Sequence, residues 1–191
     1  FRSDTRPIPA IQGWDRDETV IYLGTFSRSI APSMRIAYLV LPLPLMEIYR
    51  MRFRFYSSTV SRFEQHTLCR FLESGQYVRH LNRVGNLYKE RKKECIRQMK
   101  RQLGDIVLGG TQAGLHFILT VKNGMSEEQL VETARKEGIR LQPYSMYYQG
   151  IGQQCPKATV VIGYGGVACE EFAKMVEVLS NCWKVKKASS R

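Results

Sequence analysis

The chain has 191 residues, of which 43% are hydrophobic and 24% charged, and a formal net charge of +12 at pH 7. This composition is typical of a globular protein and excludes a disordered or fibrous one. No apolar run reaches the roughly 18 residues that a membrane helix needs, and the five cysteines lack CxxC spacing. We therefore expect a reduced cytoplasmic protein without a metal site or a membrane partner. The positive charge suits an anionic partner, or is balanced by an acidic segment outside these residues.

The first part of the chain alternates short apolar runs with polar turns. Residues 1–18 are rich in Arg, Asp and Pro and predict an extended connector. Residues 19–23 and 36–41 predict strands, the second apolar enough to be buried on both faces. Residues 46–73 predict a helix that is broken near Ser57–Ser58.

A long basic helix and a small α/β layer follow. Apolar residues at helical spacing predict a helix over residues 76–103, roughly 40 Å long. Later segments predict strands over residues 106–108, 115–121, 139–141 and 159–164. They also predict a helix over residues 126–138 that is capped by Ser126, and a closing helix over residues 170–183. We therefore predict an α/β protein with a first domain over residues 1–75, a linking helix over 76–104 and a small C-terminal domain over 105–191.

Residues 21–41 read IYLGTFSRSIAPSMRIAYLVL and hold the candidate chemistry. Thr25, Ser27 and Ser29 supply hydroxyl groups within one turn, and Arg35 adds a guanidinium whose geometry suits phosphate oxygens. Exposed backbone N–H groups in such a turn add affinity for anions. On these residues alone, a phosphate-binding loop and a solvated turn both remain open.

This segment resembles the lysine loop of fold-type I pyridoxal-phosphate (PLP) enzymes, in which S/T-F-S-K precedes a proline, an arginine and an apolar strand. It is most similar to the MocR-type regulators of the GntR superfamily, in which a winged-helix DNA-binding domain precedes an aminotransferase-like domain. The stretches FRSDTRPIPAIQG, YSSTVSRFEQHTLCRFLESGQYVRHLNR and TQAGLHFILTV carry the same resemblance. It extends to about Trp183 and implies the C-terminal part of such a domain. Residues 1–75 would end its large domain.

The resemblance also implies how a cofactor would be held. Thr25, Ser27 and Arg35 would contact the PLP phosphate, and Tyr56 would approach the cofactor of a partner subunit. The family's aspartate beside the pyridine nitrogen and its stacking aromatic residue precede the lysine, and the chain begins after them. We therefore expect this chain to bind PLP weakly and non-covalently, or not at all.

Arg28 stands at the position of the Schiff-base lysine. Attack on the cofactor aldehyde needs a neutral amine, whereas a guanidinium stays protonated and only donates hydrogen bonds. The resemblance places Val161 where the family has the arginine that binds the substrate carboxylate, and Gly85 where arginine is more usual. A natural degenerate domain and an engineered Lys-to-Arg change both explain Arg28. Val161 and Gly85 favour the first.

The leading hypothesis is therefore a catalytically silent, aminotransferase-like part of a transcription regulator, which senses an amino-acid-like ligand or dimerises. The resemblance implies a homodimer, with DNA bound only through an N-terminal domain outside these residues. One alternative is a fragment of an active PLP aminotransferase inactivated at Arg28. Another is a basic nucleic-acid-binding module, because residues 79–101 hold nine Lys or Arg against Glu90 and Glu94. A solvated helix face is the favoured explanation of that charge.

Overall fold

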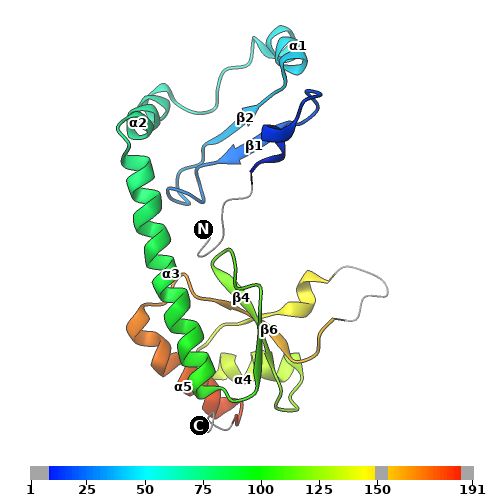
Figure 1. Cartoon of the computed structure of the whole chain (residues 1–191), viewed down its shortest axis with the longest axis vertical. Coiled ribbons are helices and arrows are strands. Elements are labelled where there is room, and N and C mark those ends of the chain that lie inside the picture. Colours follow the sequence, from blue (N-terminus) through cyan, green and yellow to red (C-terminus); the bar gives the residue numbers. More distant parts are fainter. Residues whose placement is uncertain (1–8, 149–154, 186–191) are drawn as a thin grey trace. The chain divides into compact units, whose positions relative to one another are not determined.

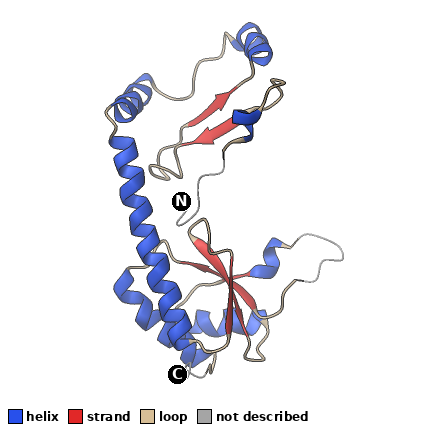
Figure 2. Ribbon diagram, viewed as in Figure 1, coloured by secondary structure: helices blue, strands red, loops and turns tan. Residues whose placement is uncertain are grey.

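The computed structural model describes residues 9–148 and 155–185, so the first eight residues of the expected connector lie outside the described residues. It has the α/β composition that the sequence predicts (Figures 1 and 2). The chain divides into two compact units at Val84 and Gly85, inside the long helix α3 (Gln76–Gln102). In the described part of the chain, no helix is long and apolar enough to cross a membrane.

The first unit contains one antiparallel strand pair and two helices. Its elements are the 3-10 helix η1 (Ile11–Trp14), β1 (Tyr22–Thr25), β2 (Ala37–Val40), α1 (Leu43–Phe53) and α2 (Arg62–Glu73). Thr25 pairs with Ala37 where the connecting loop leaves the strands. The predicted break in the helical segment is confirmed, because α2 starts anew with a capping box between Ser61 and Glu64.

The expectation that the second strand is buried on both faces is wrong. All four residues of β2 are exposed, and Tyr38, Leu39 and Val40 keep 40%, 45% and 41% of their surface. Among the described residues, β2 pairs only with β1, so no further strand extends this two-stranded sheet. Most of the exposed large apolar side chains described belong to this unit, whose buried apolar residues are Ile36 and Leu68.

The second unit is built on a four-stranded antiparallel sheet with the order β3-β4-β6-β5. Its elements are β3 (Ile106–Gly109), β4 (His116–Val121), α4 (Glu127–Lys136), β5 (Gln142–Pro143), η2 (Tyr144–Tyr147), β6 (Thr159–Gly163), η3 (Cys169–Glu171) and α5 (Phe172–Cys182). The strand predicted over residues 139–141 is wrong. Gly138 ends α4 with a φ of 79°, and the Ile139 amide still donates to the Ala134 carbonyl. Ile139 and Leu141 therefore pack against the core beside the helix end instead of pairing in the sheet.

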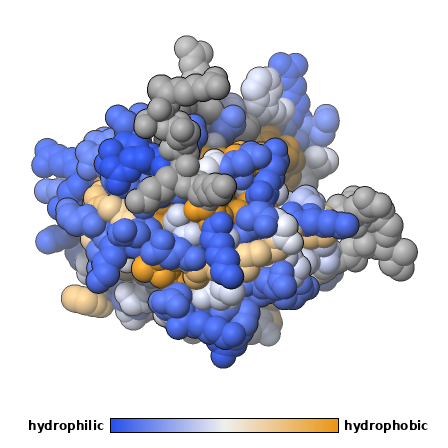
Figure 3. All heavy atoms as spheres, turned by 90° about the horizontal axis from the view of Figure 1, so that it is seen from below, coloured by the Kyte–Doolittle hydropathy of each residue, from blue (hydrophilic) through white to orange (hydrophobic). Residues whose placement is uncertain are grey.

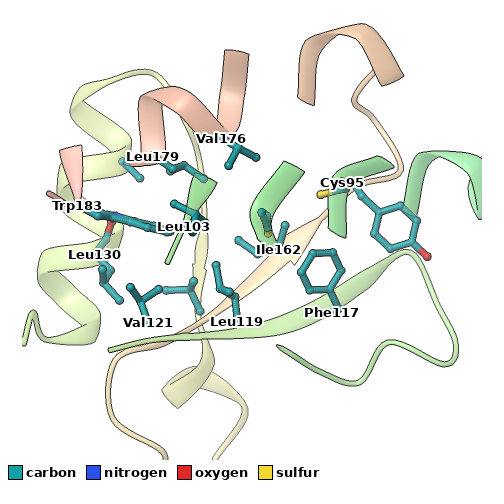
Figure 4. Close-up of a cluster of buried hydrophobic side chains, with 14 of the residues drawn as sticks. Cys95, Leu103, Phe117, Leu119, Val121, Leu130, Ile162, Val176, Leu179 and Trp183 are labelled. Atoms are coloured by element: carbon teal, nitrogen blue, oxygen red, sulfur yellow. The ribbon is translucent and has the colours of Figure 1, made fainter. Parts of the chain in front are cut away.

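One face of this sheet forms the hydrophobic core with α3, α4 and α5 (Figure 4). Phe117, Leu119 and Val121 alternate along β4 and are at most 1% exposed, as the period of two in a half-buried strand requires. Met99 comes from α3, and Trp183 follows α5 and donates its indole N–H to the Leu130 carbonyl at 3.0 Å. Each such side chain stabilises the unit by about 1.5–3 kcal/mol of transfer free energy. The face seen in Figure 3 is mostly hydrophilic.

Candidate functional site

The loop between β1 and β2 brings together the residues that the sequence predicts to hold a phosphate. Thr25 ends β1, and Ser27, Arg28 and Arg35 lie in the turn that follows. The Phe26 amide donates to the Ile36 carbonyl at 3.0 Å and closes the loop at its base. Ile36 is 7% exposed, so this end of the loop is fixed by burial as well as by hydrogen bonding.

The hydroxyl groups of the loop are used inside it. Thr25 Oγ1 lies 3.2 Å from both the Ile36 carbonyl oxygen and Ser27 Oγ, and it accepts the Ser27 amide at 3.2 Å. Ser27 Oγ donates to the Met34 carbonyl at 2.6 Å. Each hydroxyl has a single proton to donate, so a phosphate oxygen could be bound by these groups only after the protons turn away from the loop.

The two guanidinium groups are better placed to bind an anion as the loop stands. Arg28 and Arg35 are both exposed, and within the described residues neither makes a hydrogen bond or an ion pair. A guanidinium keeps its charge and offers two parallel N–H donors to a carboxylate or a phosphate. The loop can therefore attract an anion ionically without rearrangement.

Aromatic packing that was not anticipated from the sequence holds β1 and β2 together beside this loop. The Tyr38 ring lies across Gly24, where an added Cβ would stand 2.2 Å from Tyr38 Cζ. Tyr38 also contacts Phe26, with ring centroids 5.3 Å apart, and Tyr22, at 6.0 Å. The hydrogen bond with Tyr22 raises the pKa of Tyr38. A side chain at Gly24 would therefore displace the Tyr38 ring, a close approach that only the strand register reveals.

The start of α3 anchors the same loop from its other side. His80 Nε2 lies 3.1 Å from the Ser29 carbonyl oxygen, and Tyr77 meets the Phe26 ring edge-on at 6.0 Å. The His80 contact joins residues 51 positions apart, so no local pattern could have assigned its partner.

The other two predicted site residues lie outside the loop. Tyr56 follows α1, is 67% exposed and contacts the rings of Phe53 and Phe55 at 5.8 and 4.9 Å. Val161 belongs to β6 in the second unit, is 7% exposed and stands in register between Ile118 and Gln142. A valine there offers no donor to a carboxylate. Their roles in ligand binding stay predictions from resemblance.

Other possible sites do not involve the predicted cofactor residues. Across residues 9–148 and 155–185, no group of three or more His, Cys, Asp or Glu side chains could hold a metal ion. A cavity of about 570 Å³ in the second unit is lined by Val131, Ile139, Leu141 and the side chains of Arg135 and Arg140. It contains none of the residues of the β1–β2 loop.

Comparison with known proteins gives this geometry a context. No family model matches the chain. The chain is 36% identical over 186 residues to the HTH-type transcriptional regulator YdeL of Bacillus subtilis. The alignment covers 97% of this chain and 40% of that protein. It is also 30% identical over 171 residues to the probable rhizopine catabolism regulatory protein MocR of Rhizobium meliloti. That alignment covers 87% of this chain and 34% of that protein. The chain thus spans about two fifths or less of the length of these relatives.

The fold is that of the aminotransferases. The kynurenine aminotransferase of Pyrococcus horikoshii superposes with a TM-score of 0.76 at 21% identity, over 96% of this chain and 45% of that one. Sequence and structure therefore agree on the same ancestry. The chain belongs to the MocR-type family of HTH transcriptional regulators, as a homologue of their aminotransferase-like part.

Proposed function

We propose that this chain is part of the aminotransferase-like domain of a transcription regulator, which serves ligand sensing or dimerisation, and that this domain does not catalyse transamination. The relatives are HTH-type regulators, and the fold is that of aminotransferases. The observation that carries the proposal is the exposed Arg28 in the β1–β2 loop, which the resemblance assigns to the position of the Schiff-base lysine.

Arginine at this position removes the covalent step. PLP, when bound, supplies an aldehyde that reacts with a neutral amine. A lysine can be neutral when burial and neighbouring charges lower its pKa, whereas an arginine stays charged. Arg28 and Arg35 can attract the cofactor phosphate or a ligand carboxylate, but Thr25 and Ser27 donate to the loop itself. These contacts support weak, non-covalent binding of an amino-acid-like ligand or of PLP.

The partners are proposed on the same grounds. DNA would be bound by an N-terminal HTH domain of the parent protein, and the aminotransferase-like domain would pair with a second copy in the cytoplasm. The first unit supports an environment larger than this chain, because Leu23, Leu43, Phe55 and Phe63 each keep at least 71% of their surface. Apolar groups exposed to this degree and in this number are typical of surfaces that pack against other protein.

The test compares the parent protein carrying Arg28 with its Arg28→Lys variant, after addition of PLP. The readouts are the absorption band of lysine-bound cofactor, a borohydride-fixable adduct and turnover of amino acids. We expect no covalent adduct with Arg28 and no turnover by either protein. An Arg35→Lys variant is the matched control, because it places an amine in the same loop away from the lysine position.

Two results would decide against the proposal. Transamination by the Arg28→Lys variant alone would show a competent scaffold and support the alternative, an active aminotransferase inactivated at this residue. A borohydride-fixable adduct with Arg28 in place would contradict the chemical argument itself. Loss of PLP or ligand affinity in Arg35→Lys, without any covalent adduct, would agree with a two-donor guanidinium contact that lysine cannot reproduce.

A further inference from the structure

The second half of α3 carries a basic face. Its five basic side chains are all exposed: Lys89, Lys93, Arg97, Lys100 and Arg101. At about 100° per residue they fall within an arc of about 120° on the helix. Cys95 and Met99, which are fully buried in the core of the second unit, lie on the opposite side of the same helix. The basic face therefore points away from the unit's own core.

The arrangement of these charges works against the helix. Lys89 and Lys93, Lys93 and Arg97, and Arg97 and Arg101 are each four residues apart, where like charges repel and destabilise a helix. A face that only has to be solvated is stabilised by alternating charges. This one places cations in consecutive turns, and within residues 89–101 the carboxylates of Glu90 and Glu94 offset only part of their charge, which an anionic partner would offset further.

The acidic residues nearby leave the face positive. Glu94 accepts Arg97 Nε at 2.8 Å and Nη2 at 2.7 Å, and also accepts Gln98 at 2.7 Å. Glu94 also interacts electrostatically with Arg101, so it offsets part of the charge at the C-terminal end of the face. Glu90 is exposed and is the other carboxylate between Lys89 and Arg101, so the face keeps an excess of positive charge.

We propose that the basic face of α3 binds the phosphate backbone of duplex DNA, as a contact in addition to the proposed HTH domain. The choice of DNA rests on the proposed function, because the relatives are HTH-type regulators. Lys89 and Arg101 stand about 18 Å apart along the helix axis, and cations four residues apart are separated by about 6 Å along it. Tyr88 is the one aromatic residue of this half-helix and is half-buried, so no stacking platform for single strands is present. The contact would be electrostatic and independent of sequence.

The test measures binding of the 191-residue chain to a labelled 20-base-pair duplex of arbitrary sequence by fluorescence anisotropy. Neutralising three to four phosphates predicts a loss of affinity of roughly 40- to 150-fold between 50 and 200 mM salt. Replacing Lys89, Lys93, Lys100 and Arg101 by glutamine should weaken binding at 50 mM salt by about tenfold or more and flatten the salt dependence. Circular dichroism checks that the helix is retained.

A matched control removes the same charge elsewhere in the unit. Lys136, Arg140, Lys157 and Lys174 are also exposed, and their replacement by glutamine should change the affinity by less than about threefold, because they lie outside the proposed contact. Equal weakening by both variants would reduce the effect to net charge and overturn the proposal. So would absence of duplex binding at 50 mM salt, or preferential binding of a polyglutamate peptide. None of these results bears on Arg28→Lys, which is read from a covalent adduct.

Discussion

Replacing Tyr164 by phenylalanine should lower the free energy of unfolding of the second unit by about 1–2 kcal/mol. Tyr164 is 3% exposed, its hydroxyl donates to the Gly114 carbonyl at 2.5 Å, and its ring stacks on Phe117 with centroids 6.1 Å apart. The substitution keeps the ring and removes only the hydroxyl. The half-buried Gly114 carbonyl then loses its donor at the base of the β3–β4 loop.

Tyr147→Phe is the matched control. The Tyr147 hydroxyl donates to Gln142 Oε1 at 2.7 Å, but the side chain is 56% exposed, so water can replace the lost bond. We expect a loss below about 0.5 kcal/mol there. Urea unfolding followed by circular dichroism measures both variants. Equal losses for Tyr164→Phe and Tyr147→Phe would refute the reasoning that burial determines the cost.

The stability difference between the protein and its Tyr164→Phe variant should also depend on pH. Burial raises the pKa of Tyr164 above its ordinary value of 10.0, so the folded state favours the neutral phenol. The stabilisation by Tyr164 is therefore fully present below pH 10 and is lost as the pH rises through the folded pKa. The phenylalanine variant lacks this loss, so the stability difference between the two proteins should stay constant up to about pH 9 and narrow as the pH rises above 10. A constant difference would contradict the assignment.

Three further outcomes are expected. Gly85→Ala should stabilise the chain by about 1 kcal/mol in urea unfolding, because its Cβ would meet open space inside α3, whereas Gly138→Ala should destabilise it because its φ is 79°. Burial raises the pKa of the Cys95 thiol to about 12, so mass spectrometry should find it unalkylated by iodoacetamide at pH 8 until the protein unfolds. Hydrogen bonds from Arg97 and Gln98 lower the pKa of Glu94 from 4.5 to about 2. Because the pair is partly exposed, about 0.5–1 kcal/mol of stability should be present above pH 4.5 and disappear towards pH 2, and Glu94→Gln should abolish that loss in thermal unfolding.

Local patterns in the sequence were sufficient for most helices and for the identity of the loop. The helix predicted over residues 76–103 matches α3 to within one residue, because its buried side chains recur at helical spacing. Ser126 caps α4 as expected, since its hydroxyl accepts the Gln129 amide. Thr25, Ser27 and Arg28 are neighbours in the chain, so their proximity required no knowledge of the fold.

Partners distant in the sequence could not be predicted in this way. A serine or threonine hydroxyl binds a phosphate oxygen and a loop carbonyl by the same chemistry. Only the geometry shows that Ser27 donates to Met34, seven residues away, and that His80 reaches the carbonyl of Ser29. The phosphate-binding prediction for this loop therefore rests on resemblance and on the exposed guanidinium groups of Arg28 and Arg35, while the hydroxyls of Thr25 and Ser27 donate within the loop.

The error at β2 concerns the environment of the strand and not its conformation. The run IAYLVL has the composition of a strand covered on both faces, and the strand forms where predicted, at Ala37–Val40. Its side chains are nevertheless exposed in this chain, which spans about 40% of the length of the relative YdeL. The composition of a strand reflects the surroundings of its residues in the whole protein. The exposed areas of the β2 side chains are those within this chain alone. The exposure of β2 thus supports the proposal that the first unit packs against further protein.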